Sequence, residues 1–347
     1  MIRPATAIGP PVDSPPVDVI TVPDFSGPAW PRFELRTLLF LGSWLRHRGA
    51  SRTWPLHLAC IGEPPASVRH LAALAGALVT VHAPMPEPYP ATGNKLRGLE
   101  ITPRCERFLL LDTDVLVLAD LDPLARLVGG GIGAGPARFN LLSEATWRRI
   151  FDGAGVAYPA GGGLPPYFNS GVLMAPWALG LGPLWREHTR RILEHFEGDP
   201  VTAHPKWFRH AEQHALATAV AALSAQGVRV VELPLPYRAR PYLLTSGALP
   251  WRDVALFHYV KVFAPEQESV GDLSRLLYGW RLPGPRRWLA GRVGLRAVRS
   301  PLFRLVAPDR LRAYPAFYQH VHRIFLDYIA PATAAPVPGT RNNSANS

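Results

Sequence analysis

The segment Phe108-Leu-Leu-Leu-Asp112-Thr-Asp114 carries an apolar strand directly into two acidic residues. Apolar residues in an unbroken run predict a strand that is buried on both faces, as in a parallel sheet. Ligands bind at the carboxyl ends of such strands. Side chains two residues apart on an extended backbone point the same way, so Asp112 and Asp114 can face one ligand. Because Mn²⁺ and Mg²⁺ prefer oxygen ligands, the pair predicts a divalent metal site.

The sequence on both sides of this segment alternates between strand and helix patterns. Upstream, strands are expected at 17–22, 56–61 and 78–82, and helical patterns at 32–48, 65–76 and 94–100. This order predicts an α/β fold with a largely parallel sheet covered by helices on both faces. Downstream we expect glycine-rich loops at 129–135 and 161–163, strands at 115–118, 172–174, 228–233 and 254–257, and helices at 184–196 and 211–223.

The domain organisation follows from shifts in composition along the chain. We expect a flexible Pro-rich leader at 1–16, a catalytic domain at 17–265, an Arg-rich helical extension at 266–330 and a disordered tail at 331–347. No apolar run is long enough for a membrane span, and the N-terminal residues lack the apolar region of a secretory signal. The two cysteines lie far apart without metal-type spacing, which predicts a reduced, cytoplasmic chain.

The net charge of +11 is concentrated near the C-terminus. Residues 275–323 contain eleven arginines and a single acidic residue, Asp309, so the rest of the chain is close to neutral. A near-neutral body does not suit a nucleic-acid surface, and we expect no nucleic-acid partner. Basic and aromatic residues alternate within 275–328, which fits a peripheral anchor on the anionic inner face of a membrane. A helical subdomain with solvated arginines is the alternative.

Three further polar segments follow the acidic pair. Asn169-Ser170-Gly171 precedes an apolar strand, where small polar side chains and a glycine suit hydrogen bonds to sugar hydroxyls; an ordinary turn is the alternative. Glu212 and Gln213 open a helix, where Glu212 either favours the helix dipole or faces a donor sugar. His258 follows a strand, and a neutral imidazole can complete a cation's ligand set. Lys261 can neutralise a departing diphosphate. A surface histidine is the alternative for His258.

A second class of enzyme also fits the acidic strand. An apolar run followed by Asp-Thr-Asp resembles the nucleophile strand of haloacid-dehalogenase-like phosphatases, in which the first Asp, here Asp112, is phosphorylated. Those motifs usually open the domain, whereas more than a hundred residues precede Asp112. No later strand ends in an acidic pair suited to Mg²⁺. A non-catalytic, membrane-associated scaffold is a third hypothesis.

Taken in order, these segments resemble the GT-A glycosyltransferases, and they are most similar to the retaining family that includes glycogenin and bacterial lipopolysaccharide galactosyltransferases. The family pattern is a Lys upstream of Asp-x-Asp, then Asn-(Ser/Ala)-Gly-Val, then Asp-Gln, then a His followed by a Lys. Lys95 lies seventeen residues before Asp112, and the resemblance spans about residues 17–263. Two positions differ: Glu212 replaces the family's Asp, and Lys261 follows His258 by three residues instead of six.

The resemblance implies a transferase that moves a sugar from a nucleoside diphosphate, most often UDP, to a saccharide or lipid-linked acceptor. It implies Mn²⁺ or Mg²⁺ on Asp112, Asp114 and His258, with Asp114 also counted as catalytic. If transfer is retaining, Gln213 would shield the oxocarbenium-like centre. If transfer is inverting, a carboxylate must deprotonate the acceptor, and the sequence does not identify that carboxylate. The loop at 161–163 is expected to form a mobile wall over the acceptor site. The donor contacts implied are Lys95, Asp112, Thr113, Asn169, Ser170, Gly171 and Lys261, with Asn169 and Glu212 orienting the sugar hydroxyls.

Overall fold

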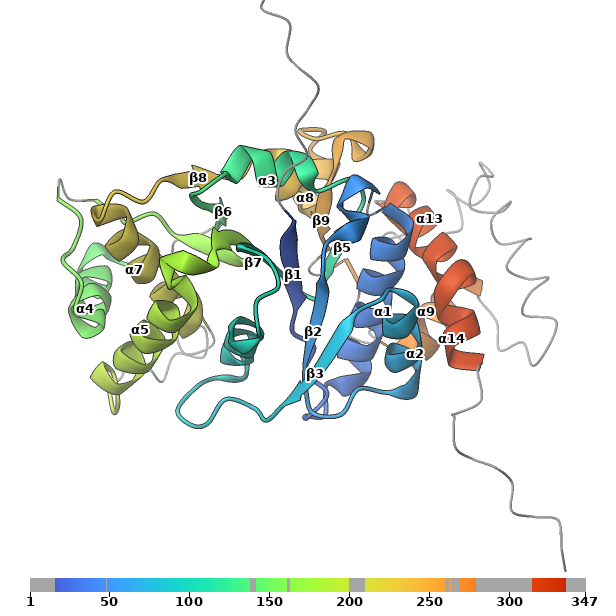
Figure 1. Cartoon of the computed structure of the whole chain (residues 1–347), viewed down its shortest axis with the longest axis horizontal. Helices are drawn as coiled ribbons and strands as arrows, with labels where there is room; N and C mark the ends of the chain where they lie inside the picture. The colour runs from blue at the N-terminus through green and yellow to red at the C-terminus, as the bar shows by residue number, and fades with distance from the viewer. Residues whose placement is uncertain are drawn as a thin grey trace, which may run out of the picture.

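A central sheet of seven strands, in the order β3-β2-β1-β4-β7-β6-β8, organises the molecule (Figure 1). The computed structural model describes residues 16–47, 49–137, 142–160, 163–199, 210–259, 262–263, 269–278 and 314–334. The strands of the sheet are β1 (Val17–Thr21), β2 (Leu56–Ile61), β3 (Leu78–His82), β4 (Arg107–Leu111), β6 (Ile132–Pro136), β7 (Phe168–Pro176) and β8 (Val230–Glu232). A second sheet pairs β5 (Val115–Val117) with β9 (Leu256–His258).

Most of the pairings in the large sheet are parallel. Strand β1 pairs in parallel with β2 and β4, and β2 pairs in parallel with β3. Strand β7 is antiparallel to both β4 and β6, and β6 is parallel to β8. The α/β class with a mostly parallel sheet flanked by helices, which the order of strand and helix patterns predicted, is therefore confirmed.

Helices cover both faces of this sheet, and they gather toward opposite ends of the molecule in Figure 1. The helices are α1 (Trp30–His47), α2 (Ala66–Leu74), α3 (Asp122–Val128), α4 (Glu144–Ala154), α5 (Leu181–His195), α7 (Ala211–Ala225), α8 (Pro241–Thr245), α9 (Val270–Tyr278), α13 (Pro315–Ile324) and α14 (Ala330–Ala334). The 3-10 turns are η1 (Gly49–Thr53), η2 (Ala91–Glu100), η3 (Trp177–Leu179), η5 (Leu235–Tyr237) and η6 (Trp251–Asp253), and η8 (Phe325–Ile329) is a π turn. None of the helices in the described part of the chain is both long and apolar enough to cross a lipid bilayer.

The strand β4 shows why the apolar run is buried on both faces. Leu109 and Leu111 belong to a core shared with α1, α2 and α13, whereas Phe108 and Leu110 belong to a core shared with α4, α5 and α7. Successive side chains of a strand point to opposite faces, so a strand between two helical layers must be apolar at every position. The buried strand that the sequence predicted ahead of Asp112 is confirmed.

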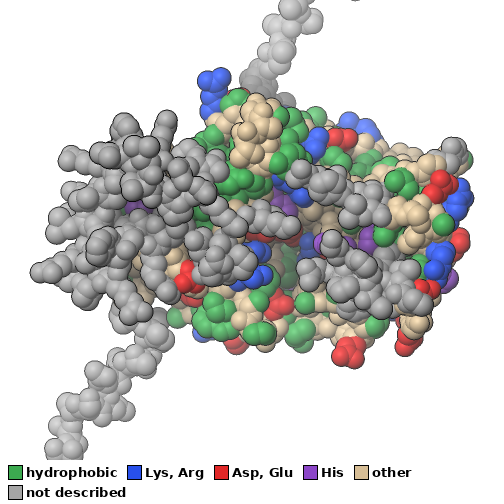
Figure 2. Space-filling model, turned by 180° about the vertical axis from the view of Figure 1, so that it is seen from behind, with side chains coloured by type: hydrophobic (Ala, Val, Ile, Leu, Met, Phe, Trp, Pro, Cys, Tyr) green, Lys and Arg blue, Asp and Glu red, His purple; other side chains and the backbone are tan. Residues whose placement is uncertain are grey.

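Helix α13, from the C-terminal part of the chain, packs against α1. Its Phe317, Val321 and Ile324 are fully buried in the same core as α1. A Cβ added at Gly42 on α1 would lie 2.3 Å from Ile324 Cγ2, so the glycine allows the two helices to approach closely. Most arginines of the predicted 275–328 membrane segment, and its residues 279–313, lie outside the described residues. On the described part of the face in Figure 2, basic and acidic side chains are interspersed.

Two glycine-rich or polar segments differ from the sequence prediction. Residues 132–136, expected within a loop, form strand β6. Glycine is needed there for close packing, since a Cβ at Gly133 would lie 2.4 Å from Val128 Cγ2. Asn169-Ser170-Gly171, expected as a loop before a strand, lie inside β7.

Helix α4 was not predicted from the sequence. Ser143 caps its first turn by accepting a hydrogen bond from the Thr146 amide at 3.2 Å.

Two buried histidines, His188 on α5 and His214 on α7, predict acid sensitivity. Burial lowers the pKa of His188 to about 4 and that of His214 to about 3. An unfolded histidine has a pKa of about 6.5. The contribution of each buried, neutral histidine to the free energy of unfolding is therefore complete above this pH, and it is lost as the pH falls toward the pKa of the folded state. Each histidine should therefore cost about 2 kcal/mol of unfolding free energy between pH 7 and pH 5.

The measurement is urea unfolding of the wild-type chain and of His214→Phe at pH 7 and pH 5. Phenylalanine keeps the aromatic contacts that His214 makes with Trp147 and Tyr167, at centroid distances of 5.4 and 5.5 Å. The variant should lose about 2 kcal/mol less than the wild-type chain over this pH interval. An equal loss in both chains would contradict the assignment to His214.

Candidate metal and donor site

Three predicted metal ligands meet where the two sheets join. Asp112 follows β4 and Asp114 precedes β5. His258 ends β9, which pairs antiparallel with β5 so that Val115 lies opposite His258. The Tyr259 amide donates to the Asp114 carbonyl at 3.0 Å and holds this register. Each of the three side chains offers a ligand atom, and these atoms lie within 4.8 Å of one another.

The His258 ring contacts both acidic side chains. His258 Nε2 lies 2.9 Å from Asp114 Oδ1 and 3.8 Å from Asp112 Oδ2. The side chains of His258 and Asp114 are nearly buried, whereas that of Asp112 is 27% exposed. Two carboxylates and one imidazole form a donor set that suits Mn²⁺ or Mg²⁺.

Lys95, from η2, contacts Asp112 of this cluster. Its Nζ donates to Asp112 Oδ1 at 2.9 Å and to Ser170 Oγ at 2.8 Å. Burial alone would lower the pKa of Lys95, but the charges of Asp112 and Glu212 outweigh it and hold the pKa above its usual value. The ammonium group is therefore charged and fixed in place beside Asp112.

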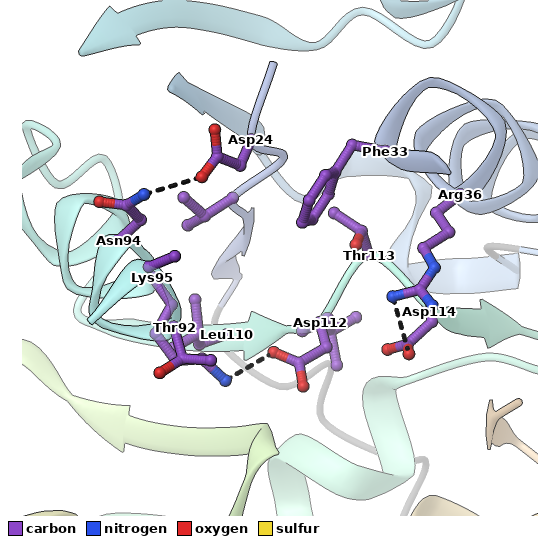
Figure 3. Close-up of a pocket in the computed structure, with 13 residues that line it drawn as sticks. Asp24, Phe33, Arg36, Thr92, Asn94, Lys95, Leu110, Asp112, Thr113 and Asp114 are labelled. Carbon is purple, nitrogen blue, oxygen red and sulfur yellow. Dashed lines mark hydrogen bonds and ion pairs between the residues drawn. The ribbon is translucent and has the colours of Figure 1, made fainter. Parts of the chain in front are cut away.

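Arg36, from α1, holds the other acidic side chain. Its Nη1 lies 3.3 Å from Asp114 Oδ2; a dashed line marks this ion pair in Figure 3. Burial raises the pKa of Asp114, but His258, Arg36 and Lys95 together hold it below its usual range, so the side chain is a carboxylate. Sequence reasoning did not identify Arg36, because one arginine in an arginine-rich helix carries no distinguishing signal.

Gly171 has no side chain that could cover the predicted ligand atoms of Asp112 and His258. A Cβ at this position would lie 2.6 Å from Asp112 Oδ2, 2.6 Å from His258 Cε1 and 2.9 Å from Asn169 Oδ1. The backbone there is fixed, because the Asp112 amide donates to the Gly171 carbonyl at 3.0 Å. Only glycine fits between these three side chains without displacing them.

Glu212 and Gln213 begin α7 next to this cluster. Glu212 is buried, accepts a hydrogen bond from Thr92 Oγ1 at 3.1 Å, and has a pKa raised by burial against the opposing effects of Lys95 and Thr92. The Asn169 amide nitrogen lies 3.4 Å from Gln213 Oε1. The Gln213 amide lies 2.7 Å from His210 Nδ1, so both amide groups have fixed orientations.

A pocket of about 190 Å³ opens between α1, η2 and the acidic pair (Figure 3). Asn94 and Asp24 are joined by a 2.8 Å hydrogen bond on its far side. Sequence reasoning missed Asp24, although the carboxyl end of β1 lies next to that of β4 and marks this edge of the sheet. The lining residues are Val22, Asp24, Phe33, Arg36, Ala91, Thr92, Asn94, Lys95, Leu110, Leu111, Asp112, Thr113 and Asp114.

Residues 31–224 match the Rhodobacterales glycosyltransferase domain. The chain belongs to this family. It is therefore a glycosyltransferase, as the sequence predicted, and the phosphatase interpretation of Asp112 is wrong. No curated protein matches the chain.

Solved structures similar to this glycosyltransferase are also sugar transferases. An active-site mutant of LgtC has 18% identity and a TM-score of 0.48, covering 79% of this chain and 99% of that chain. The galactosyltransferase LgtC with donor and acceptor sugar analogues has 17% identity and a TM-score of 0.42, covering 79% and 100%. GlyE from Streptococcus pneumoniae TIGR4 in its apo form has 16% identity and a TM-score of 0.41, covering 81% and 60%.

The glycosyltransferase brings most of the predicted site residues into one region. Lys95, Asp112, Thr113 and Asp114 line the pocket. Ser170 contacts Lys95, and Asn169 contacts Gln213. Their roles remain predictions. Lys261 and residues 161–162 of the predicted acceptor wall lie outside the described residues.

Proposed function

We propose that this glycosyltransferase transfers a sugar from a UDP-linked donor to a saccharide or lipid-linked acceptor, with retention and with a divalent cation. The observation that carries the proposal is the convergence of Asp112, Asp114 and His258 within 4.8 Å, beside a charged lysine and next to a pocket that the two acidic residues line. Charged side chains of both signs, including Lys95, Arg36 and the acidic pair, line this pocket of about 190 Å³.

The residues present fit a divalent cation. Two carboxylates and an imidazole supply hard oxygen and nitrogen donors, and the absence of a side chain at Gly171 leaves these donors accessible. Asp112, Asp114 and His258 would hold the ion. When bound, the cation supplies Lewis-acid stabilisation of the charge on the leaving diphosphate.

Lys95 is the chain's own group for binding the diphosphate. Its ammonium group is fixed by Asp112 and Ser170, so it needs no rearrangement to offer a positive charge at the pocket. A preorganised charge stabilises a developing anion more than a mobile one does. Lys261 is proposed as a further phosphate contact.

Asn169, Glu212 and Gln213 are proposed to orient the donor sugar. Asn169 and Gln213 hold each other, and Glu212 is fixed by Thr92, so all three polar groups have defined directions. Gln213 presents an amide oxygen, which can stabilise a positively charged anomeric centre without acting as a base. This arrangement supports retention of configuration.

The experiment is a thermal-shift screen of UDP-, GDP- and dTDP-sugars, each with and without Mn²⁺. A ligand that binds only the folded state stabilises it by about 2.7 kcal/mol at a concentration of 100 Kd. We expect UDP-sugars with Mn²⁺ to raise the melting temperature by several degrees, and GDP- and dTDP-sugars to raise it less. A chain that responds to none of these donors in the presence of Mn²⁺ would sink the proposal. A larger response to GDP- or dTDP-sugars would replace UDP as the donor.

A further inference from the structure

The two acidic side chains of the site share one arrangement. Each carboxylate turns one oxygen toward His258 and the other toward a cation. Asp112 has Oδ2 3.8 Å from His258 Nε2 and Oδ1 2.9 Å from Lys95 Nζ. Asp114 has Oδ1 2.9 Å from His258 Nε2 and Oδ2 3.3 Å from Arg36 Nη1. Lys95 and Arg36 thus play matching parts, although they come from different elements.

The charges of these four side chains balance before any ligand arrives. Asp112 and Asp114 contribute two negative charges, and Lys95 and Arg36 contribute two positive charges. The four side chains are between 8% and 27% exposed, so water screens these charges only in part. A bare divalent cation would therefore meet carboxylates that are already neutralised and would be repelled by both neighbouring cations. A cation that arrives with a diphosphate brings its own compensating negative charge.

Arg36 also faces the pocket in which the donor is proposed to bind. It lines this pocket together with Phe33, one turn away on the same face of α1. A guanidinium group presents its N–H donors in a planar fork that matches phosphate oxygens. The same side chain can therefore contact Asp114 in the empty enzyme and a phosphate in the loaded one.

We propose that Arg36 is a second diphosphate-binding residue of this site and that it makes the divalent cation and the nucleoside diphosphate bind cooperatively. This inference rests on the proposed function. Arg36 opposes the binding of the cation alone by neutralising Asp114, and a diphosphate that binds with the cation removes this opposition. Because binding coupling is reciprocal, the cation raises the affinity for the diphosphate by the same factor.

The test is calorimetric titration of Mn²⁺ into the full chain, with and without saturating UDP. In the wild-type chain we expect UDP to tighten Mn²⁺ binding by about 10-fold or more. Arg36→Met keeps an unbranched, flexible side chain but removes the guanidinium group and its charge. This variant should bind Mn²⁺ alone more tightly than the wild-type chain does, by about 10-fold, and UDP should then tighten it by no more than about 3-fold. Arg36→Lys keeps the charge and should retain most of the coupling.

Arg46→Met is the matched control. Arg46 lies on the same helix but forms its ion pair with Asp327 at the surface, at 2.7 Å, so its loss should leave both titrations unchanged. If UDP tightens Mn²⁺ binding to Arg36→Met as much as it does in the wild-type chain, the role of Arg36 is overturned, but the proposed function is not. Weaker binding of Mn²⁺ alone in Arg36→Met would also overturn it, because Arg36 would then only orient Asp114. A wild-type chain that binds no UDP with Mn²⁺ would overturn the proposed function as well.

Discussion

Asp114→Asn is expected to reduce sugar transfer on the order of 10³-fold. Asparagine has the same shape as aspartate but no charge. It would remove a carboxylate that lies 2.9 Å from His258 and 3.3 Å from Arg36, and it would leave Arg36 without its anionic partner. The site would then carry an excess positive charge and would repel a divalent cation.

Two measurements separate this effect from unfolding. Calorimetry should show that Asp114→Asn has lost binding of Mn²⁺ in the presence of UDP, while its circular dichroism spectrum stays that of the wild-type chain. Asp327→Asn is the control, because Asp327 also pairs with an arginine of α1 but is 49% exposed and does not line the pocket. A transfer rate in Asp114→Asn above about a tenth of the wild-type rate would show that Asp114 does not hold the cation.

The sequence was sufficient to locate the acidic pair because two physical signals coincide there. Phe108 to Leu111 must be apolar on both faces to lie between helical layers, and the first polar residues after them must stand at the edge of the sheet. Strand order and the carboxyl-end rule then place Asp112 at the edge of the sheet where a ligand is expected, without any knowledge of tertiary contacts. His258 was a candidate ligand from its place after a strand, but only the family resemblance joined it to the acidic pair, because nothing local to β9 shows that it pairs with β5.

Arg36 could not be found in this way. Its contact with Asp114 depends on the angle at which α1 crosses the sheet, and a helical pattern in the sequence gives the period of a helix but not its position. The sequence also could not predict that β7 runs antiparallel to β4, since a buried strand has the same apolar pattern in either direction. Gly133 was misread as part of a loop because the sequence cannot distinguish a glycine required by backbone conformation from one required by close packing.

Gly171→Ala is expected to lower transfer on the order of 10²-fold, although it adds a single methyl group. The added Cβ would lie 2.6 Å from both Asp112 Oδ2 and His258 Cε1, closer than atoms of these types approach in proteins. Gly171 cannot retreat, because β7 is paired with β4 next to it and its carbonyl accepts the Asp112 amide. The carboxylate and the imidazole must move instead, and displaced ligands should lower the affinity for Mn²⁺ about 10- to 100-fold.

Gly130→Ala is the control for the loss of a glycine, because a Cβ at Gly130 would meet no atom within 4 Å. It should leave both Mn²⁺ binding and transfer unchanged. The loss of activity in Gly171→Ala should not come with a large loss of stability, because alanine costs less backbone entropy on folding than glycine does. Melting temperatures near that of the wild-type chain are therefore expected for both variants. Unchanged Mn²⁺ affinity in Gly171→Ala would mean that Asp112 and His258 do not bind the cation from the positions they occupy here, and the metal site would have to be sought elsewhere.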